Sequence, residues 1–255
     1  MPVLAPGEAA HASRRAIVSN GVHAHLTTFI GANRYVAGTA PPPGPEAVYP
    51  MAFLVEQPAG SVVDAHFHEA NQFQLVVAGS GTLGTHAVRP IAVHYSNAYS
   101  AYGPITAGAD GLHYLTLRNG YDRGARYLPA AREELRGVRR RFRAAVADAA
   151  PPGAPAAEPM TETLLAGTPD GLGAWRHRLP PGAALQGPDP AGGDGQFWVV
   201  TAGALQAADG ATLPALSCAF VGPAEPPLAV TAGAAGLEVV VMQYPRGRDH
   251  VAGQE

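Results

Sequence analysis

The sequence has no lysine, so its 17 basic residues are all arginine, and only 15% of its 255 residues are charged. With 20 acidic residues the net charge is −3, which provides no general attraction to nucleic acid or to an anionic membrane. A single cysteine, Cys218, excludes an internal disulfide and a cysteine-based zinc cage. We therefore expect a protein without disulfides that binds no nucleic acid.

Long apolar runs are also missing. No stretch of about 18 uncharged apolar residues is present, so we expect no membrane span. The N-terminus has neither the basic nor the apolar segment of a signal peptide, which predicts a cytoplasmic protein. The chain is nevertheless 47% hydrophobic and contains 31 glycines and 25 prolines, a composition that favours short strands and turns around a real core.

An internal repeat is the most informative feature of the sequence. Residues Gln72–Gly79 (QFQLVVAG) return as Gln196–Gly203 (QFWVVTAG), and Thr106–Leu112 (TAGADGL) returns as Thr231–Leu237 (TAGAAGL). The two offsets, 124 and 125 residues, are nearly equal and too long for a solenoid repeat. We infer two copies of one domain, each built from short β-rich runs between turns.

The segment between the two copies is predicted to contain one helix at residues 129–149. Leu135, Val138, Phe142 and Val146 recur there at helical spacing.

The residues that follow, 149–159, include four prolines and indicate a linker. The predicted organisation is therefore a first domain at 1–128, a helix and linker at 129–159, and a second domain at 160–255.

One constellation in the first copy carries possible metal chemistry. Gly60 is followed by five residues, then His66 and His68, three more residues, Gln72, and after six residues Gly79. Residues i and i+2 of a strand face the same side, so the two imidazoles could chelate one metal ion. A third ligand would come from the next turn or strand, where Gln72 lies.

This spacing resembles the first motif of the cupin superfamily, which has a glutamate at the position of Gln72. Together with the repeat, the resemblance implies a bicupin, an all-β chain with two jelly-roll barrels. It also implies one divalent transition metal (Fe, Mn, Ni or Zn) held by His66, His68 and Gln72, and chemistry similar to that of cupin dioxygenases. Imidazole ligands suit these metals.

The fourth ligand stays open in the sequence. The family's second motif ends in a metal-binding histidine shortly before the last long strand, where this chain has Tyr102. His94 and His113 compete for the same place. We favour Tyr102, which could also donate or accept a proton at a bound substrate. The predicted substrate contacts inside the barrel are Phe73, Leu75, Tyr95, His94 and His113.

The second copy has lost the histidine pair. Alignment on Gly182 places Pro188 and Pro190 at the two histidine positions, so this barrel cannot hold the same metal site.

The leading functional hypothesis is a metal-dependent bicupin enzyme acting on a small organic molecule in the first barrel. One alternative is a non-catalytic bicupin that binds or senses a small molecule. Another is an O2-independent, metal-assisted lyase, isomerase or decarboxylase. The resemblance also implies a homodimer.

Overall fold

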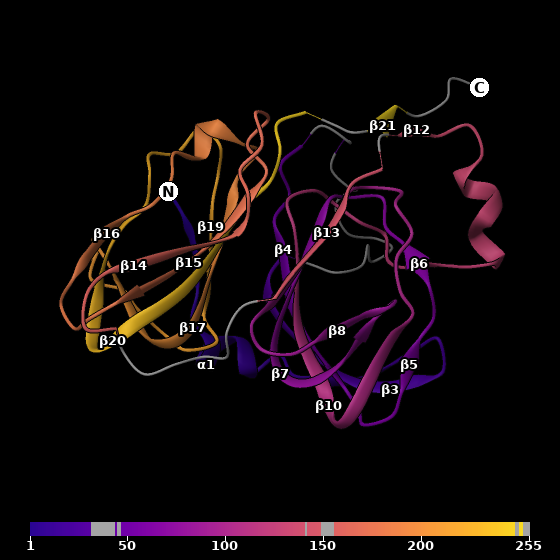
Figure 1. Cartoon of the computed structure of the whole chain (residues 1–255), viewed down its shortest axis with the longest axis horizontal. Coiled ribbons are helices and arrows are strands. Elements are labelled where there is room, and N and C mark those ends of the chain that lie inside the picture. Colours follow the sequence, from indigo (N-terminus) through magenta and orange to yellow (C-terminus); the bar gives the residue numbers. More distant parts are fainter. Residues whose placement is uncertain (32–43, 45–46, 141, 149–155, 248–249, 252–255) are drawn as a thin grey trace. The chain divides into compact units, whose positions relative to one another are not determined.

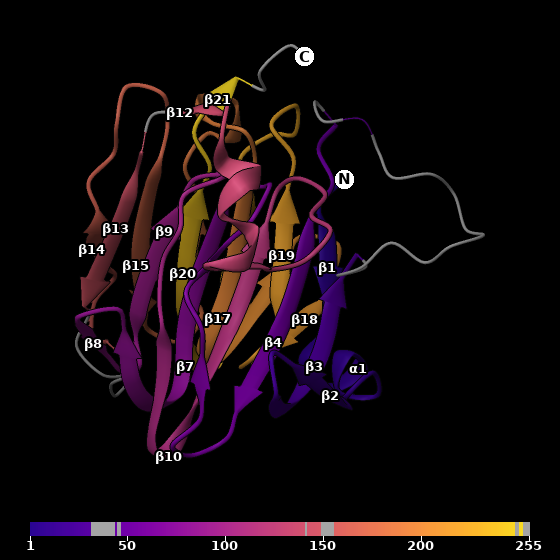
Figure 2. The same ribbon diagram turned by 90° about the vertical axis from the view of Figure 1, so that its right-hand side faces the viewer.

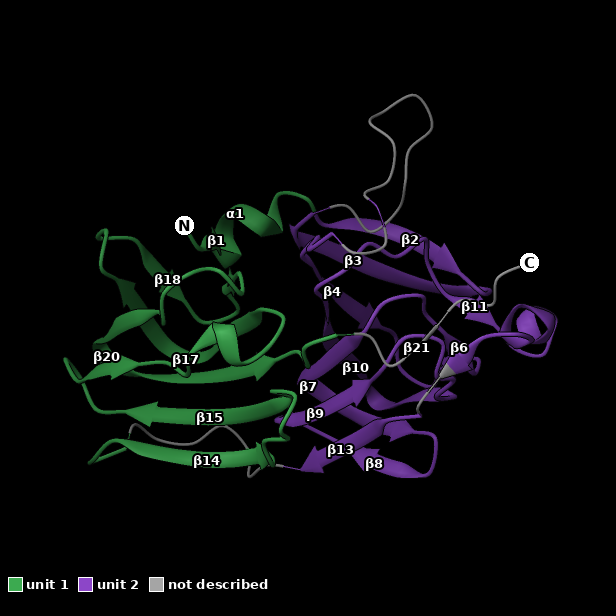
Figure 3. Cartoon of the chain, turned by 90° about the horizontal axis from the view of Figure 1, so that it is seen from above, with its two compact units in different colours: residues 1–13, 150–247 green, residues 14–149, 248–255 purple. Residues whose placement is uncertain are grey.

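The computed structural model describes the chain except for residues 32–43, 45–46, 141, 149–155, 248–249 and 252–255. Most of the predicted linker therefore lies outside the described residues. The chain forms two compact units, which Figure 3 shows in different colours. We call residues 14–149 with 248–255 the N-terminal barrel, and residues 1–13 with 150–247 the C-terminal barrel.

The N-terminal barrel is built on one antiparallel sheet in the order β13-β9-β7-β10-β4-β3-β2, with β5 beside β10 and β8 beside β7. Figure 1 labels most of these strands. The strands of this sheet are β2 (Arg15–Ser19), β3 (Val22–Ile30), β4 (Met51–Gln57), β5 (Val62–Val63), β7 (Gln72–Leu83), β8 (His86–Val88), β9 (Ala92–Ser96), β10 (Ile105–Arg118) and β13 (Ala144–Asp148). Two short pairs complete the unit: β6 (His66–Phe67) with β11 (Arg126–Tyr127), and β12 (Arg139–Arg140) with β21 (His250–Val251).

The C-terminal barrel has a matching antiparallel sheet in the order β1-β19-β17-β20-β15-β14, with β16 beside β20 and β18 beside β17. Its strands are β1 (Val3–Ala5), β14 (Met160–Leu165), β15 (Gly173–Leu179), β16 (Ala184–Gln186), β17 (Gln196–Ala207), β18 (Thr212–Pro214), β19 (Cys218–Val221) and β20 (Ala229–Gln243). The helices are α1 (Gly7–His11) and the 3-10 helix η2 (Pro190–Gly192). Two large antiparallel sheets confirm the predicted all-β fold.

The first residues of the chain belong to the C-terminal barrel rather than to the N-terminal barrel. Strand β1 pairs with β19 over three residues, which attaches residues 1–13 to the C-terminal barrel. The predicted first domain, 1–128, thus differs from the observed unit at both of its ends, because the unit also includes the segment after residue 128.

The repeated segments form equivalent strands in the two units. The glycine-rich repeats lie on β7 and β17, which each have 12 residues, and on their long neighbours β10 and β20 (Figure 2). Gly79 and Gly203 both have positive φ, and a Cβ on either would overlap the carbonyl oxygen of Gly111 or Gly236. The repeated glycines are therefore required because the backbones of the two neighbouring strands approach so closely in each barrel that a Cβ does not fit.

The prediction of one helix over residues 129–149 is wrong. The structure has the 3-10 helix η1 (Ala130–Leu135) and then β12 and β13. Strand β13 pairs with β9 and is itself the edge strand of the sheet, with Val146 opposite His94, while Phe142 is 64% exposed. Hydrogen bonding along a sheet edge overrides a local helical spacing of apolar residues. Within the described residues, no helix is long and apolar enough to cross a membrane.

Candidate functional site in the N-terminal barrel

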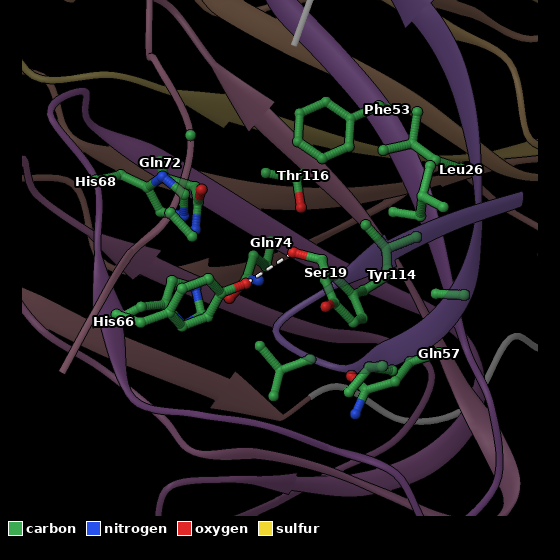
Figure 4. Close-up of a pocket in the computed structure, with 18 of the residues that line it drawn as sticks. Ser19, Leu26, Phe53, Gln57, His66, His68, Gln72, Gln74, Tyr114 and Thr116 are labelled. Atoms are coloured by element: carbon green, nitrogen blue, oxygen red, sulfur yellow. Dashed lines mark hydrogen bonds between the residues drawn. The ribbon is translucent and has the colours of Figure 1, made fainter. Parts of the chain in front are cut away.

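A cavity of about 120 Å³ lies inside the N-terminal barrel (Figure 4). Alternate residues of the three central strands form one part of its wall. They are Phe53, Val55 and Gln57 of β4, Gln72 and Gln74 of β7, and Tyr114, Thr116 and Arg118 of β10. The polar part of the wall also includes His66, His68, Tyr102, Ser19 and Tyr127, and the hydroxyl oxygens of Ser19 and Tyr127 are 2.9 Å apart.

The apolar residues predicted as substrate contacts lie elsewhere. Phe73, Leu75 and Tyr95 are fully buried, but the cavity wall contains Gln72 and Gln74 instead. Side chains alternate between the faces of a strand, so an inward Gln72 directs Phe73 to the other side. Both faces of β7 are buried here, and hydrophobicity alone therefore did not distinguish the inner face from the outer one.

The predicted histidines His94 and His113 are not in the cavity wall either. His94 lies on β9 with its Nδ1 2.9 Å from Oε1 of Gln74, and its ring centroid is 4.9 Å from that of Tyr102. His113 is half-buried on β10, one residue from the inward-facing Tyr114. Strand alternation again separates the two neighbours.

The two motif histidines present the same nitrogen to the cavity. Nδ1 of His66 is 2.7 Å from the carbonyl oxygen of Asp64, and Nδ1 of His68 is 2.9 Å from Oδ1 of Asp122. Both partners are acceptors, so each Nδ1 carries the proton and each Nε2 keeps a lone pair. Nε2 of His66 accepts a hydrogen bond from the hydroxyl of Tyr102 at 2.9 Å, and backbone hydrogen bonds between the two residues hold them side by side.

Arg118 and Gln72 are directly opposite each other on β10 and β7. Nε and Nη2 of Arg118 donate to Oε1 of Gln72 at 2.9 and 2.7 Å. This orients the amide, whose Nε2 donates to the hydroxyl oxygen of Tyr102 at 2.6 Å. The result is a directed chain of hydrogen bonds from Arg118 through Gln72 and Tyr102 to His66.

The guanidinium of Arg118 also packs on His68. Its Nη2 is 3.1 Å from both ring nitrogens of His68. An atom in the plane of the ring and equidistant from both nitrogens would collide with Cε1, so Nη2 lies over the face of the imidazole. Nε2 of His68 therefore keeps its in-plane lone pair.

Asp122 is fully buried behind this group and is supported by several donors. Its carboxylate accepts hydrogen bonds from the backbone N–H groups of Glu69 and Gly124, at 2.9 and 2.8 Å, and from His68. Nη1 of Arg118 is 3.3 Å away. Charge and hydrogen bonds thus hold Asp122 as a carboxylate.

Burial and these charges set the protonation states. Burial, assisted by the neighbouring His68, lowers the pKa of His66 to about 3, and burial beside Arg118 lowers the pKa of His68 as well. Burial alone would raise the pKa of Asp122, but Arg118 and His68 outweigh it and hold that pKa well below its usual range. Burial raises the pKa of Tyr102. At neutral pH the site contains two neutral imidazoles, one carboxylate and one guanidinium.

The predicted metal ligands come together, but their donor atoms do not complete a metal centre. Oε1 of Gln72 is bound twice by the cation of Arg118, and Nε2 of His66 is bound by Tyr102. Among the described residues, no three His, Cys, Asp or Glu side chains form a group that could hold a metal ion. Only Nε2 of His68 is left as an uncommitted in-plane donor, which is too few for a three-ligand site.

The structure adds three residues that the sequence did not indicate: Arg118, Asp122 and Gln57. Arg118 is 46 residues from Gln72 in the chain, and only the β7–β10 register brings them together. A basic residue at the end of an apolar strand, LHYLTLR, was the one local signal for it.

The C-terminal barrel has a different interior. Gln196 and Gln243 occupy the positions of Gln72 and Arg118, and their amides bond each other at 2.7 Å. An apolar cluster that includes Trp198 and Leu179 fills this barrel.

Comparisons with known proteins establish the fold. No family model matches the sequence, and no curated protein matches it. A candidate dioxygenase of Nostoc punctiforme matches with a TM-score of 0.58 and 12% identity, covering 100% of this chain and 84% of the other. The pirin YhhW of Escherichia coli, in complex with nickel(II), matches at 0.53 and 10% identity over 96% and 99%. Oxalate decarboxylase of Bacillus subtilis matches at 0.57 and 12% identity over 99% and 78%. The chain has the bicupin fold.

Proposed function

We propose that the N-terminal barrel binds a small carboxylate beside Arg118, and that this guanidinium supplies the positive charge for which a metal was predicted. The double hydrogen bond from Arg118 to Gln72 carries the proposal, because it commits the predicted third metal ligand to a permanent cation. Guanidinium groups match the geometry of carboxylates better than any other protein cation.

The buried carboxylate of Asp122 does not use up this cation. Asp122 already accepts hydrogen bonds from two backbone N–H groups and from His68. Its ion pair with Nη1 of Arg118 engages one of the two N–H groups on that nitrogen. The second N–H is the donor that we assign to the ligand.

Metal-dependent catalysis, including a dioxygenase-like reaction, is the second candidate. The orientation of His66 and His68 favours it, because each imidazole donates its Nδ1 proton to an oxygen and directs Nε2 inward, as metal-binding histidines do. It requires Tyr102 to leave His66 and Arg118 to leave Gln72. A homodimer and a cytoplasmic location stay predictions from the sequence.

The decisive experiment measures metal content and carboxylate binding in the same preparations. Untagged wild-type protein, purified without chelator and then incubated with Fe(II), Mn(II), Ni(II) or Zn(II), is analysed by mass spectrometry for metal. Pentanoate binding is followed by calorimetry. We expect the wild type to bind pentanoate and to hold far less than one metal per chain.

A gain-of-function variant sharpens the test. In Gln72→Glu/Arg118→Leu the third donor is a free carboxylate, so we expect metal binding to appear and pentanoate binding to weaken about tenfold or more. Gln196→Glu, the matched change in the C-terminal barrel, should do neither. Near-stoichiometric metal in the wild type that is lost in His66→Ala/His68→Ala would overturn the proposal in favour of the second candidate.

A further inference from the structure

A second polar group lies in the cavity wall at the far end of β4. Gln57 is completely buried, and its Nε2 donates to the carbonyl oxygens of Ser61 and Ile105 at 2.9 and 3.1 Å. Only the NH2 group of an amide can donate to two carbonyls, so the orientation of this side chain is fixed. Its Oε1 has no hydrogen-bond partner in the described part of the chain. A buried acceptor without a donor costs free energy unless a ligand provides one.

The second copy of the domain shows that the fold does not need an amide at this position. Gln57 ends β4 opposite Leu112, and Leu179 ends β15 opposite Leu237. Leu179 is part of the apolar cluster that fills the C-terminal barrel. The polar residue therefore belongs to the copy that has a cavity.

Gln57 and Arg118 mark the two ends of the cavity. In the β4–β10 register, Arg118 pairs with Met51, six residues from Gln57, which corresponds to about 20 Å between their Cα atoms along the strand. Figure 4 shows Gln57 across the pocket from His68 and Gln72, the two residues that Arg118 contacts. The wall between the ends includes apolar side chains: Leu26, Phe53, Val55 and Val63.

We propose that the ligand is a hydroxycarboxylic acid that spans the cavity. Its carboxylate binds Arg118, its hydrocarbon part lies along the apolar wall, and its hydroxyl donates to Oε1 of Gln57. The donor is a neutral hydroxyl rather than an ammonium group, because the described wall contains no acidic side chain to balance a second buried cation. This inference rests on the carboxylate site proposed above.

The test compares matched ligands on the wild-type protein by calorimetry. The probes are straight-chain ω-hydroxy acids from hydroxypentanoate to hydroxydecanoate, the plain alkanoates of equal length, and the corresponding ω-amino acids. A hydroxyl makes a chain less hydrophobic and by itself weakens binding to an apolar wall. We expect one chain length at which the hydroxy acid nevertheless binds about fivefold or more tightly than its alkanoate, and no such gain for the amino acid.

Two variants locate the effect. Gln57→Leu copies the second barrel and should abolish the preference for the hydroxyl while alkanoate binding is retained. Gln206→Leu makes the same change at an exposed position of β17 in the C-terminal barrel; it is the matched control and should keep the preference. If Gln57→Leu does not fold, the wild-type series decides alone.

The outcomes separate this inference from the function on which it rests. Failure of every carboxylate to bind overturns both. Binding of alkanoates with no gain from a hydroxyl at any length, or with a gain that persists in Gln57→Leu, overturns only the hydroxy acid assignment. An amino acid that binds as tightly as the hydroxy acid also refutes the neutral donor.

Discussion

Mild acid should destabilise the N-terminal barrel because its buried histidines are neutral. Burial, assisted by His68, lowers the pKa of His66 from 6.5 to about 3, and burial, assisted by His86, does the same for His94. Below pH 6.5 the unfolded chain takes up protons that the folded barrel refuses. The free energy of unfolding therefore falls as the pH falls from 6.5 toward 3.

The size of this effect follows from the two lowered pKa values. At pH 5 each of these histidines lowers the free energy of unfolding by about 2 kcal/mol. This follows because pH 5 lies 1.5 units below the ordinary pKa of 6.5, and one pH unit corresponds to about 1.4 kcal/mol. The two together cost about 4 kcal/mol, and His68, whose pKa is also lowered, acts in the same direction. This is a large part of the roughly 5–15 kcal/mol that stabilises a typical domain.

Hydrogen exchange of peptides from β7 and β10, corrected for the intrinsic pH dependence of exchange, measures this loss. The fluorescence of Trp175 and Trp198 follows the C-terminal barrel separately, because the sequence has no other tryptophan. Replacing one buried histidine, as in His94→Gln, should reduce the pH slope by up to about 1.4 kcal/mol per pH unit. Protection that stays constant between pH 7.5 and 5, or a slope unchanged in His94→Gln, would refute the reasoning.

Three further predictions concern single sites. Arg118→Met should lower the free energy of unfolding, measured in urea, by about 3–5 kcal/mol, because it removes a partner of the buried Asp122 carboxylate. Adding Asp122→Asn should restore part of this loss. A double variant as unstable as Arg118→Met would contradict the reasoning. Gly79→Ala should cost roughly 2–3 kcal/mol because its φ is positive and a Cβ would overlap the carbonyl of Gly111, and a neutral substitution would disprove that account. Cys218 is fully buried with a raised pKa, so Ellman's reagent should react with it only after unfolding; rapid reaction of the native protein would show the packing to be wrong.

The sequence alone was sufficient for the fold and for part of the site. The repeated segments predicted two copies of one β domain, because glycines at the β7–β10 and β17–β20 crossings are required by backbone contacts that occur in each copy. The His66–His68 pair was recognisable because the two residues are only two positions apart, a spacing that places both side chains on the same side of an extended segment. A site can be predicted from local spacing in the sequence when its residues are close together in the chain.

The tertiary structure decided the remainder. Strand register placed Arg118 against Gln72 and Gln57 at the other end of the cavity, and neither pairing has a signature in local sequence. The segment around Val146, predicted to be helical, forms strand β13 because it hydrogen-bonds to β9. Contacts between distant segments change both the conformation of a segment and the chemistry of a site. The same histidine motif that predicted a metal centre is for this reason found bonded into a network with a buried arginine.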